Sequence, residues 1–283
     1  MDIGDRMKGY EKVWDQKLPR RVPVLARIDG VSFSKLTERY KFKKPYDKTF
    51  IEAMYTAMQN VVTNVAGVVL AYHQSDEITV LLKNNQTFET EPYAANRIQK
   101  LTSHLAALAT CGFNKELGGG GDKPAFFDCR VWTVPEAEIN NSFLWRQQDA
   151  FRNCVQAVAH YGLKEKLNLK GRAVQKLMAN KSTNELQELI FKELGINIDT
   201  YPTHLKRGTC MVKKSYLEDR AHWVIDENIP IFSKDPGYIE DQYFSTEEEL
   251  DNKQRTQTGL SLEELESIEH EVLIEDEALP DEH

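Results

Sequence analysis

Apolar residues follow two kinds of spacing in the first half of the chain. Short runs rich in Val, Ile and Leu are typical of buried strands, whereas apolar residues that recur every three or four positions are typical of one face of a helix. This order, βαββαβ, predicts an α+β fold: a ferredoxin-like antiparallel sheet with helices on one face. The predicted strands are residues 21–28, 67–72, 77–82 and 125–134, and the predicted helices are residues 47–64 and 93–111.

The rest of the chain adds C-terminal helices and strands and one N-terminal helix. Ser182 and Glu185 have the spacing of a capping box at the start of one of these helices. The N-terminal helix is amphipathic, so it is expected to pack against the sheet, and residues 67–72 are expected to lie beside the first strand. The further elements are helices at residues 5–17, 140–161, 172–178 and 182–194, a strand at 206–214, and a short strand pair at 223–225 and 230–233.

Charge divides the chain unevenly. The net charge is −8, but residues 238–283 carry −14 and the preceding residues carry +6. We therefore predict a body in two parts, residues 1–137 and 138–237, followed by an acidic tail at 238–283 that contains one amphipathic helix near residues 260–273. A basic body is suited to a polyanionic partner such as nucleic acid.

Composition excludes two classes of protein. No apolar run approaches the roughly 20 residues that cross a bilayer, and the first residues do not form a signal peptide. The four cysteines are dispersed and form no C-x-x-C pair, so neither a disulfide framework nor a zinc site is expected. With 41% apolar residues the chain can build a substantial core, and a cytoplasmic, membrane-free location is predicted.

Two acidic motifs follow predicted strands. Asp29 and Gly30 end the first strand, and Ser75-Asp76 forms the tip of a predicted hairpin. Such motifs often serve only as turns. If the strands are neighbours, however, both carboxylates lie at one edge of the sheet, where a hard divalent cation such as Mg²⁺ would relieve their repulsion. That arrangement is typical of a two-metal phosphoryl-transfer site.

Five segments in one order resemble the tRNA-His guanylyltransferase family, the 3′-to-5′ nucleotide polymerases. The match extends over roughly residues 5–215. The residues that follow the fifth segment, however, differ from the eukaryotic members of the family. At residues 151–157 only Asn153 remains of a His-Ile-Asn-Asn-Leu-Tyr-Asn motif, and Ser34 replaces a common His. These departures resemble the bacterial and archaeal guanylyltransferase-like branch, which is associated with repair of truncated tRNA 5′ ends. The five segments are residues 27–37, 42–47, 71–77, 127–131 and 145–149.

The resemblance implies a role for each motif residue. Asp29, Asp76 and the carbonyl of Gly30 would hold two Mg²⁺, and Ser75 and Lys44 would complete the catalytic set. ATP would activate a 5′-monophosphate as an adenylate, and the 3′-hydroxyl of an incoming nucleotide such as GTP would then attack, chosen by pairing with the opposite strand. The implied nucleotide-binding residues are Arg27, Asp29, Gly30, Val31, Ser32, Phe33, Ser34, Lys44, Asp47, Ser75 and Asp76.

Contacts with tRNA are expected mainly from basic residues, which could equally lie on a solvated face. Residues 1–137 would then be the catalytic palm, and residues 138–237 would complete the catalytic body and contact tRNA. Family members assemble as tetramers, so a homotetramer is expected. The candidate RNA-binding residues are Arg97, Lys100, Arg130, Arg146, Arg152, Asn153, Lys206 and Arg207.

Two alternatives from other classes remain open. A palm-fold nucleotide cyclase would act on a nucleoside triphosphate without RNA, but the Gly-Gly usual before its acidic turn is absent before Ser75. A metal-free RNA-binding module would require neither Mg²⁺ nor triphosphate. The glycine run at residues 118–121 lacks the strand, loop and helix pattern of a phosphate-binding loop, and we interpret it as a flexible connection.

Overall fold

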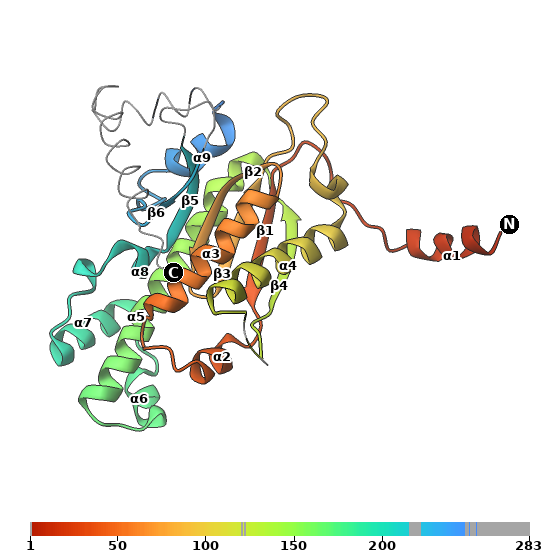
Figure 1. Ribbon diagram of the computed structural model, residues 1–283. Helices are drawn as coiled ribbons and strands as arrows, with labels where there is room; N and C mark the ends of the chain where they lie inside the picture. Colours follow the sequence, from red (N-terminus) through yellow and green to blue (C-terminus); the bar gives the residue numbers. More distant parts are fainter. Residues whose placement is uncertain are drawn as a thin grey trace, which may run out of the picture.

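The computed structural model describes residues 2–119, 121, 123–214, 222–246, 249 and 253. Its centre is a six-stranded antiparallel sheet in the order β4-β1-β3-β2-β5-β6 (Figure 1). The α+β prediction is confirmed, and β4-β1-β3-β2 is the strand order of a βαββαβ unit. The strands are β1 Val24–Gly30, β2 Val68–Gln74, β3 Glu77–Leu82, β4 Phe127–Thr133, β5 Thr209–Lys214 and β6 His222–Asp226.

Two helices, α3 (Lys48–Asn64) and α4 (Ile98–Glu116), cover one face of the sheet (Figure 1). The Asp47 side chain caps α3 by accepting a hydrogen bond from the Phe50 N–H (3.2 Å), as its position predicts. The helices approach closely at Gly112, where a Cβ would lie 2.7 Å from the Thr56 carbonyl oxygen. The predicted core face of α3, which includes Met54 and Met58, is buried.

The opposite face of the sheet is covered by α5 (Ile139–Lys166) and α9 (Gly237–Phe244). Phe143 of α5 and Tyr243 of α9 pack with Tyr72 in a second core. The sheet is therefore buried on both sides, and all six residues of β3 are buried. A strand that is buried on both faces can carry apolar residues in succession, as Val80, Leu81 and Leu82 do at the end of β3.

The C-terminal half of α5 supports a third apolar cluster with two shorter helices. These are α6 (Gly171–Met178) and α7 (Thr183–Leu194), and the predicted capping box between Ser182 and Glu185 is present. Among the described helices, none is long and apolar enough to span a bilayer. The remaining helical turns are α2 Phe33–Arg39, η1 Tyr93–Asn96, η2 Glu136–Glu138, η3 Ile198–Thr200 and α8 Thr203–Arg207.

The strand beside β1 differs from the prediction, because β3 lies between β1 and β2. Asp29 is opposite Glu77, and Ala26 is opposite Val80. The helix α3 carries the chain across the sheet, so that β2 runs parallel to β1 one strand further away. The tight hairpin then places β3 in the gap, which is the usual outcome in a split βαβ unit.

The N-terminal helix α1 (Ile3–Lys12) extends away from the body instead of packing against the sheet (Figure 1). None of its residues is buried, and its apolar residues Met7 and Tyr10 are 46% and 67% exposed. The segment that follows is nevertheless fixed, because Arg97 donates to both carboxylate oxygens of Asp15 at 2.6 Å. The amphipathic pattern was identified correctly, but none of the described part of the body covers it.

Two C-terminal predictions also need correction. The first residues of the predicted strand 206–214 belong to α8. The helix ends at Arg207, Gly208 adopts a positive φ of 85°, and β5 begins at Thr209. Residues 230–233 form no strand, and the Phe232 N–H instead donates to the side-chain oxygen of Gln147 (3.0 Å). The predicted helix near 260–273 lies outside the described residues.

Candidate active site

The two predicted carboxylates lie at the same edge of the sheet. Asp29 is the penultimate residue of β1, and Asp76 lies in the turn between β2 and β3. The Gly30 N–H donates to the Asp76 carbonyl oxygen (3.0 Å), so the end of β1 is bound directly to the tip of the hairpin. The two acidic segments, 47 positions apart in the sequence, therefore meet through the β1–β3 pair.

The backbone on both sides of this contact is unusual. Ser32 and Ser75 have φ values of 57° and 53°, in the left-handed region that residues other than glycine rarely adopt. Ser32 precedes α2, whose first residue, Phe33, is buried against three aromatic rings and lies where a Cβ on Gly30 would be. Strained positions held by their surroundings are typical of ligand-binding and catalytic sites.

Residues 30–34 were predicted to bind nucleotide, and two of their backbone amides already have partners within the protein. The Gly30 N–H donates to Asp76, and the Val31 N–H donates to the Phe126 carbonyl oxygen at 2.9 Å. Those two amides therefore hold the loop in place. Within this segment the amides of Ser32, Phe33 and Ser34 are the ones left as candidates for a phosphate.

Burial raises the pKa of Asp76, and the nearby charge of Asp29 raises it further. The Ser75 hydroxyl donates to Asp76 Oδ1 (3.0 Å) and acts in the opposite direction, as does the charge of Lys44. A cation stabilises two carboxylates whose negative charges repel each other in this way.

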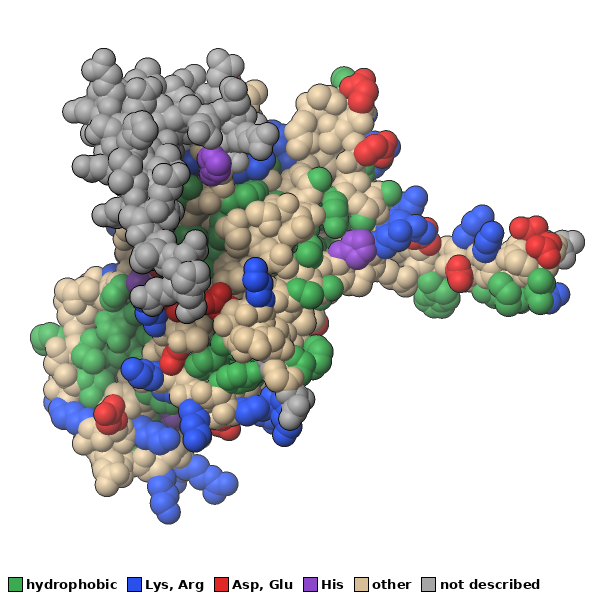
Figure 2. Space-filling model, viewed as in Figure 1, with side chains coloured by type: hydrophobic (Ala, Val, Ile, Leu, Met, Phe, Trp, Pro, Cys, Tyr) green, Lys and Arg blue, Asp and Glu red, His purple; other side chains and the backbone are tan. Residues whose placement is uncertain are grey.

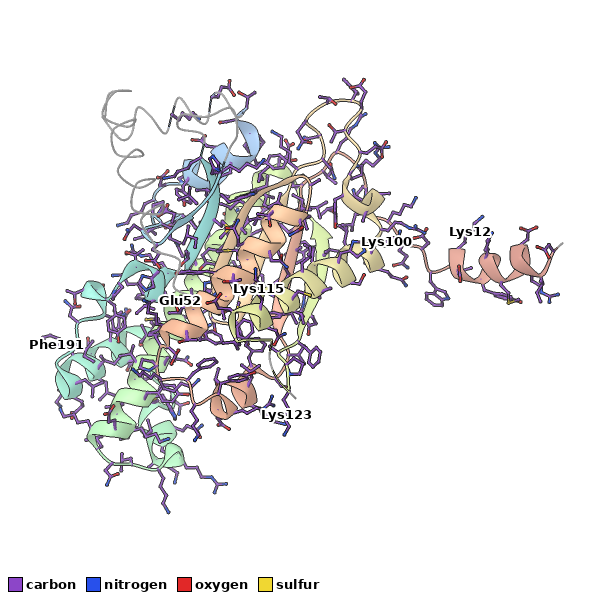
Figure 3. The ribbon with its side chains drawn as sticks, viewed as in Figure 1. Lys12, Glu52, Lys100, Lys115, Lys123 and Phe191 are labelled. Atoms are coloured by element: carbon purple, nitrogen blue, oxygen red, sulfur yellow. The ribbon has the colours of Figure 1, made fainter. Side chains whose placement is uncertain are left out.

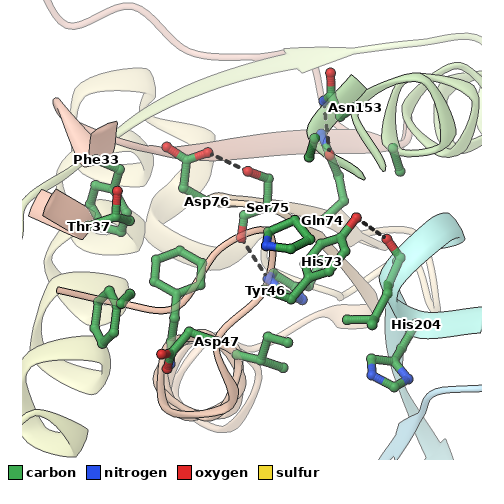
Figure 4. Close-up of a pocket in the computed structure, with 18 of the residues that line it drawn as sticks. Phe33, Thr37, Tyr46, Asp47, His73, Gln74, Ser75, Asp76, Asn153 and His204 are labelled. Atoms are coloured by element: carbon green, nitrogen blue, oxygen red, sulfur yellow. Dashed lines mark hydrogen bonds between the residues drawn. The ribbon is translucent and has the colours of Figure 1, made fainter. Parts of the chain in front are cut away.

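A cavity of about 350 Å³ opens beside Asp76 (Figure 4). Asp76, Ser75 and Thr37 lie on one side of it, and Asn153 of α5 lies across from them. Asp29 does not line this cavity, so Asp76 is the one carboxylate of the pair that faces the cavity, and Asp29 lies beside it. A cavity of this size with a few polar groups is typical of a small-molecule site.

Lys44 reaches the same cavity from the loop before α3. Its ammonium donates to the Thr37 hydroxyl (2.8 Å), which in turn donates to the Ser34 carbonyl oxygen (3.0 Å). Partial burial lowers the pKa of Lys44, while the charges of Glu38, Asp76 and Asp47 raise it. The ammonium is therefore held at a fixed position next to the turn formed by Ser75 and Asp76, the carboxylate turn.

Asp47, predicted to bind nucleotide, mainly shapes the loop. Its carboxylate accepts from the Lys43 N–H (2.7 Å) as well as from the Phe50 N–H. The residue lines the cavity near Tyr46 (Figure 4), so a direct contact with a ligand remains a prediction.

Arg27 and Glu77 face the α5 side of the sheet. The Arg27 guanidinium lies 3.8 Å from Glu77, and Arg146 of α5 donates to the same carboxylate at 3.0 Å. Burial raises the pKa of Glu77, while the charges of Arg146 and Arg27 lower it. Arg27 does not line the cavity and belongs to an ionic cluster with Glu77 and Arg146, so its contact with nucleotide stays a prediction.

The predicted RNA-binding residues differ in how far they are exposed to solvent. Arg146 and Lys206 are buried, because Arg146 pairs with Glu77 and Asp149 and Lys206 donates to the Asp199 carbonyl oxygen. A surface contact is therefore not available to these two, which support the fold. Arg97 is held by Asp15 and Arg207 is half-buried, whereas four others are exposed, with Lys100 visible on α4 (Figure 3). The exposed candidates are Lys100, Arg130, Arg152 and Asn153.

Sequence reasoning missed several residues that line the cavity. Thr37 and Gln74 belong to motif segments already noted, but their polar type gave no separate signal. His73 is buried, and burial lowers its pKa to about 4, so the ring is neutral near pH 7. Its Nε2 lies 2.9 Å from the Ser75 carbonyl oxygen, which requires an Nε2–H donor and fixes the strained turn.

The donor set at the sheet edge fits a hard cation. Asp29 and Asp76 supply carboxylate oxygens, and Gly30 supplies a backbone carbonyl between them, which are the ligand types that Mg²⁺ prefers. In the described part of the chain, no group of three or more His, Cys, Asp and Glu side chains is arranged for a metal. A cation here would complete its coordination with water or phosphate oxygens, as Mg²⁺ usually does.

Comparison with known proteins connects this geometry to a family. Residues 4–135 match the family model described as tRNAHis guanylyltransferase, and residues 137–271 match the model described as Thg1 C terminal domain. The tRNA(His) guanylyltransferase of Candida glabrata is 30% identical over 203 residues, which covers 69% of this chain and 84% of the relative.

Two solved structures are more similar in sequence. A bacterial tRNA(His) guanylyltransferase (Thg1)-like protein in complex with ATP matches with a TM-score of 0.75 and 36% identity, over 86% of this chain and all of the other. A complex of such a protein with GTP gives a TM-score of 0.70 at 36% identity, over 86% of this chain and 99% of the other. The chain belongs to the tRNAHis guanylyltransferase family, a family of nucleotidyltransferases.

Proposed function

We propose that this protein adds nucleotides to the 5′ end of tRNA in the 3′-to-5′ direction, after ATP has activated the 5′-monophosphate. The observation that carries the proposal is the meeting of Asp29 and Asp76 at one edge of the sheet, beside a cavity that also contains Lys44 and Ser75. Family membership and the ATP and GTP complexes of similar bacterial proteins support nucleotides as substrates.

The metal ions of the proposed site would be two Mg²⁺, held by Asp29, Asp76 and the Gly30 carbonyl. When bound, they would lower the pKa of an attacking hydroxyl and neutralise charge on the leaving group. The chain's own part is to hold these oxygens in place. Ser75 donates to Asp76 and fixes one carboxylate oxygen, and His73 fixes the Ser75 carbonyl.

The triphosphate site is proposed next to Lys44. Its ammonium is already fixed by Thr37, so it can meet a phosphate oxygen with little additional loss of side-chain freedom. The remainder of the cavity, between Asp47 and Asn153, is proposed to take the nucleoside. Pairing with the opposite tRNA strand would select the incoming nucleotide, so this cavity need not discriminate between bases.

RNA contacts are proposed for the exposed basic residues near the carboxylate edge, mainly Arg130 and Arg152. The separation of a basic body from an acidic C-terminal segment supports this assignment, because phosphate contacts supply much of the affinity for RNA. Lys100, exposed on α4, and the half-buried Arg207 are proposed to contact other parts of a tRNA.

A homotetramer is proposed as the assembly. α1 exposes apolar residues along one side, Trp14 after it is 68% exposed, and none of the described body covers them. The outer surface of α3 and α4 offers a face with few charges, since residues 53–64 and 101–114 contain no Asp, Glu, Lys or Arg (Figure 2). In a chain with 28% charged residues, such a face is typical of a subunit interface.

The function is tested with a tRNA that lacks its first nucleotide and carries a 5′-[³²P]monophosphate. Incubation with ATP, GTP and Mg²⁺ should lengthen it by one nucleotide, and the Asp29→Ala variant should not. Formation of a cyclic nucleotide from triphosphate alone would instead favour the cyclase. RNA binding without any Mg²⁺-dependent product would reject the proposed chemistry.

A further inference from the structure

Trp145 is an exposed aromatic residue on α5. This helix crosses the face opposite α3 and α4 (Figure 1), and Trp145 is 50% exposed. Phe143 and Arg146, on neighbouring positions of the helix, are buried. A half-exposed indole leaves part of its ring available to a ligand, and tryptophan is enriched where an aromatic ring meets a partner.

The indole is held in a fixed orientation. The guanidinium of Arg146 lies 3.6 Å from the ring centroid. Arg146 is itself fixed by Glu77 at 3.0 Å and Asp149 at 3.4 Å. Arg146 Nε is buried and has no hydrogen-bond partner among the described residues, so the cluster gives up a hydrogen bond while it supports the ring. A ring fixed in this way can stack on a ligand with little entropy loss.

The indole also lies close to the proposed site of chemistry. Arg27 is 5.9 Å from its ring centroid, and Arg27 and Asp29 point to the same face of β1 because they are two residues apart. Their Cα atoms are therefore separated by about 7 Å along the strand. Asp76 faces the nucleotide cavity, whereas Asp29 faces this second surface.

Two exposed guanidiniums flank the surface. Arg130 lies 3.9 Å from both Asp29 and Asp128, which is beyond hydrogen-bonding distance, so both contacts leave its donors available to a phosphate. Arg152 lies one helical turn beyond Asp149 and is 51% exposed. An aromatic platform bordered by guanidiniums is the arrangement that binds single-stranded nucleic acid, by stacking on bases and pairing with phosphates.

We infer that Trp145 stacks on the base of the 5′-terminal nucleotide of the RNA substrate, whose 5′-phosphate then reaches Asp29 and Asp76. This inference rests on the proposed function and adds to it a residue that touches the RNA end. The incoming nucleotide and the RNA end would thus occupy opposite sides of the carboxylate pair, the cavity and the Trp145 surface respectively.

The test uses a tRNA with 2-aminopurine as its 5′-terminal base, since stacking quenches the fluorescence of that base. Binding to the whole protein without nucleotide should quench the signal, and Trp145→Ala should remove the quenching. The same variant should raise KM for the RNA about 5- to 150-fold, the range expected for one base stacked on an aromatic ring. KM for the nucleoside triphosphate should not change.

Two variants separate stacking from folding. Trp145→Phe keeps an aromatic face and should retain part of the quenching. Phe191→Ala removes an aromatic residue that is 63% exposed on a different helix, α7 (Figure 3), and should behave as the wild type. Quenching and RNA KM that are unaltered in Trp145→Ala would overturn the inference.

A third variant separates this inference from the proposed reaction. Asp29→Ala should quench normally while making no product, because stacking needs no turnover. If the wild type quenches but never extends the RNA, the proposed function fails and the stacking site stands. If the wild type extends the RNA and Trp145→Ala binds it equally well, the proposed function stands and the stacking site fails.

Discussion

Replacing Arg146 with methionine tests the ionic cluster behind the carboxylate turn. Methionine keeps much of the side-chain length, so the main change is the loss of the guanidinium that pairs with Glu77 at 3.0 Å. Arg146 and Glu77 are both 8% exposed at their side chains, and after the change Glu77 retains Arg27 at 3.8 Å and a hydrogen bond from the Thr79 hydroxyl at 3.3 Å. A buried carboxylate that loses its main partner destabilises a protein strongly.

The expected cost follows from this burial. Removing one partner of a buried pair lowers the free energy of unfolding by about 3–5 kcal/mol. For a chain of this size each kcal/mol corresponds to roughly 2–4 °C in Tm, so Tm should fall by about 6–20 °C. Urea unfolding followed by circular dichroism measures the free energy directly, with the midpoint as the readout.

A matched control lies one and a half turns further along the same helix. Arg152 pairs with Asp149 at 2.8 Å but is 51% exposed, so Arg152→Met should cost about 0–1 kcal/mol. The double variant Arg146→Met with Glu77→Gln removes the buried carboxylate charge, leaves the charge of Arg27, which is 15% exposed, and should be more stable than Arg146→Met alone. If Arg146→Met costs no more than Arg152→Met, the cluster does not stabilise the sheet edge as argued.

Three further predictions concern the site itself. Asp76→Asn should raise Tm without metal, because it removes a buried charge near Asp29, and should abolish any Mg²⁺-dependent rise in Tm; a retained Mg²⁺ effect in thermal scans would contradict the assignment. Lys44→Met should raise KM for the triphosphate about 10- to 100-fold, as for a lost charged hydrogen bond, with little change in KM for RNA. His73 has a pKa lowered to about 4 by burial, so the unfolded chain binds its proton first, and stability should fall by about 3 kcal/mol as pH drops from 6.5 to 4. His73→Gln should remove that part of the loss in urea titrations at pH 5 and pH 7.5.

Local sequence patterns were sufficient to predict the helices and strands that pack into the core. The β2–β3 hairpin and the long helices were predicted because their apolar residues repeat at the period of the element, and Asp47 and Ser182 mark helix starts with side-chain caps. The failure at α1 has a physical reason. Its apolar stripe is real, but a sequence pattern specifies a face that needs covering and does not specify which surface covers it.

Long-range pairing explains the other differences. Arg146 resembles a surface residue in the sequence, because its partner Glu77 is 69 positions away and only the fold brings them together. Lys206 is buried through a contact nearer in the sequence, with the Asp199 carbonyl oxygen that precedes its own helix. The cavity needed Asn153 and Thr209 from elements that no local motif connects to Lys44.

The two acidic residues of the motif Ser75-Asp76-Glu77 have different roles, because their side chains lie in different surroundings. Asp76 lies in the turn between β2 and β3 and faces the cavity. Glu77 is the first residue of β3, and its side chain points to α5. The buried pair with Arg146 therefore fixes the residue next to the proposed metal ligand. Arg146 also supports Trp145, so the same guanidinium couples the position of the carboxylate turn to the surface proposed for the RNA end. A change at Arg146 should consequently lower kcat and raise KM for RNA together, whereas a change at Trp145 should affect only the KM.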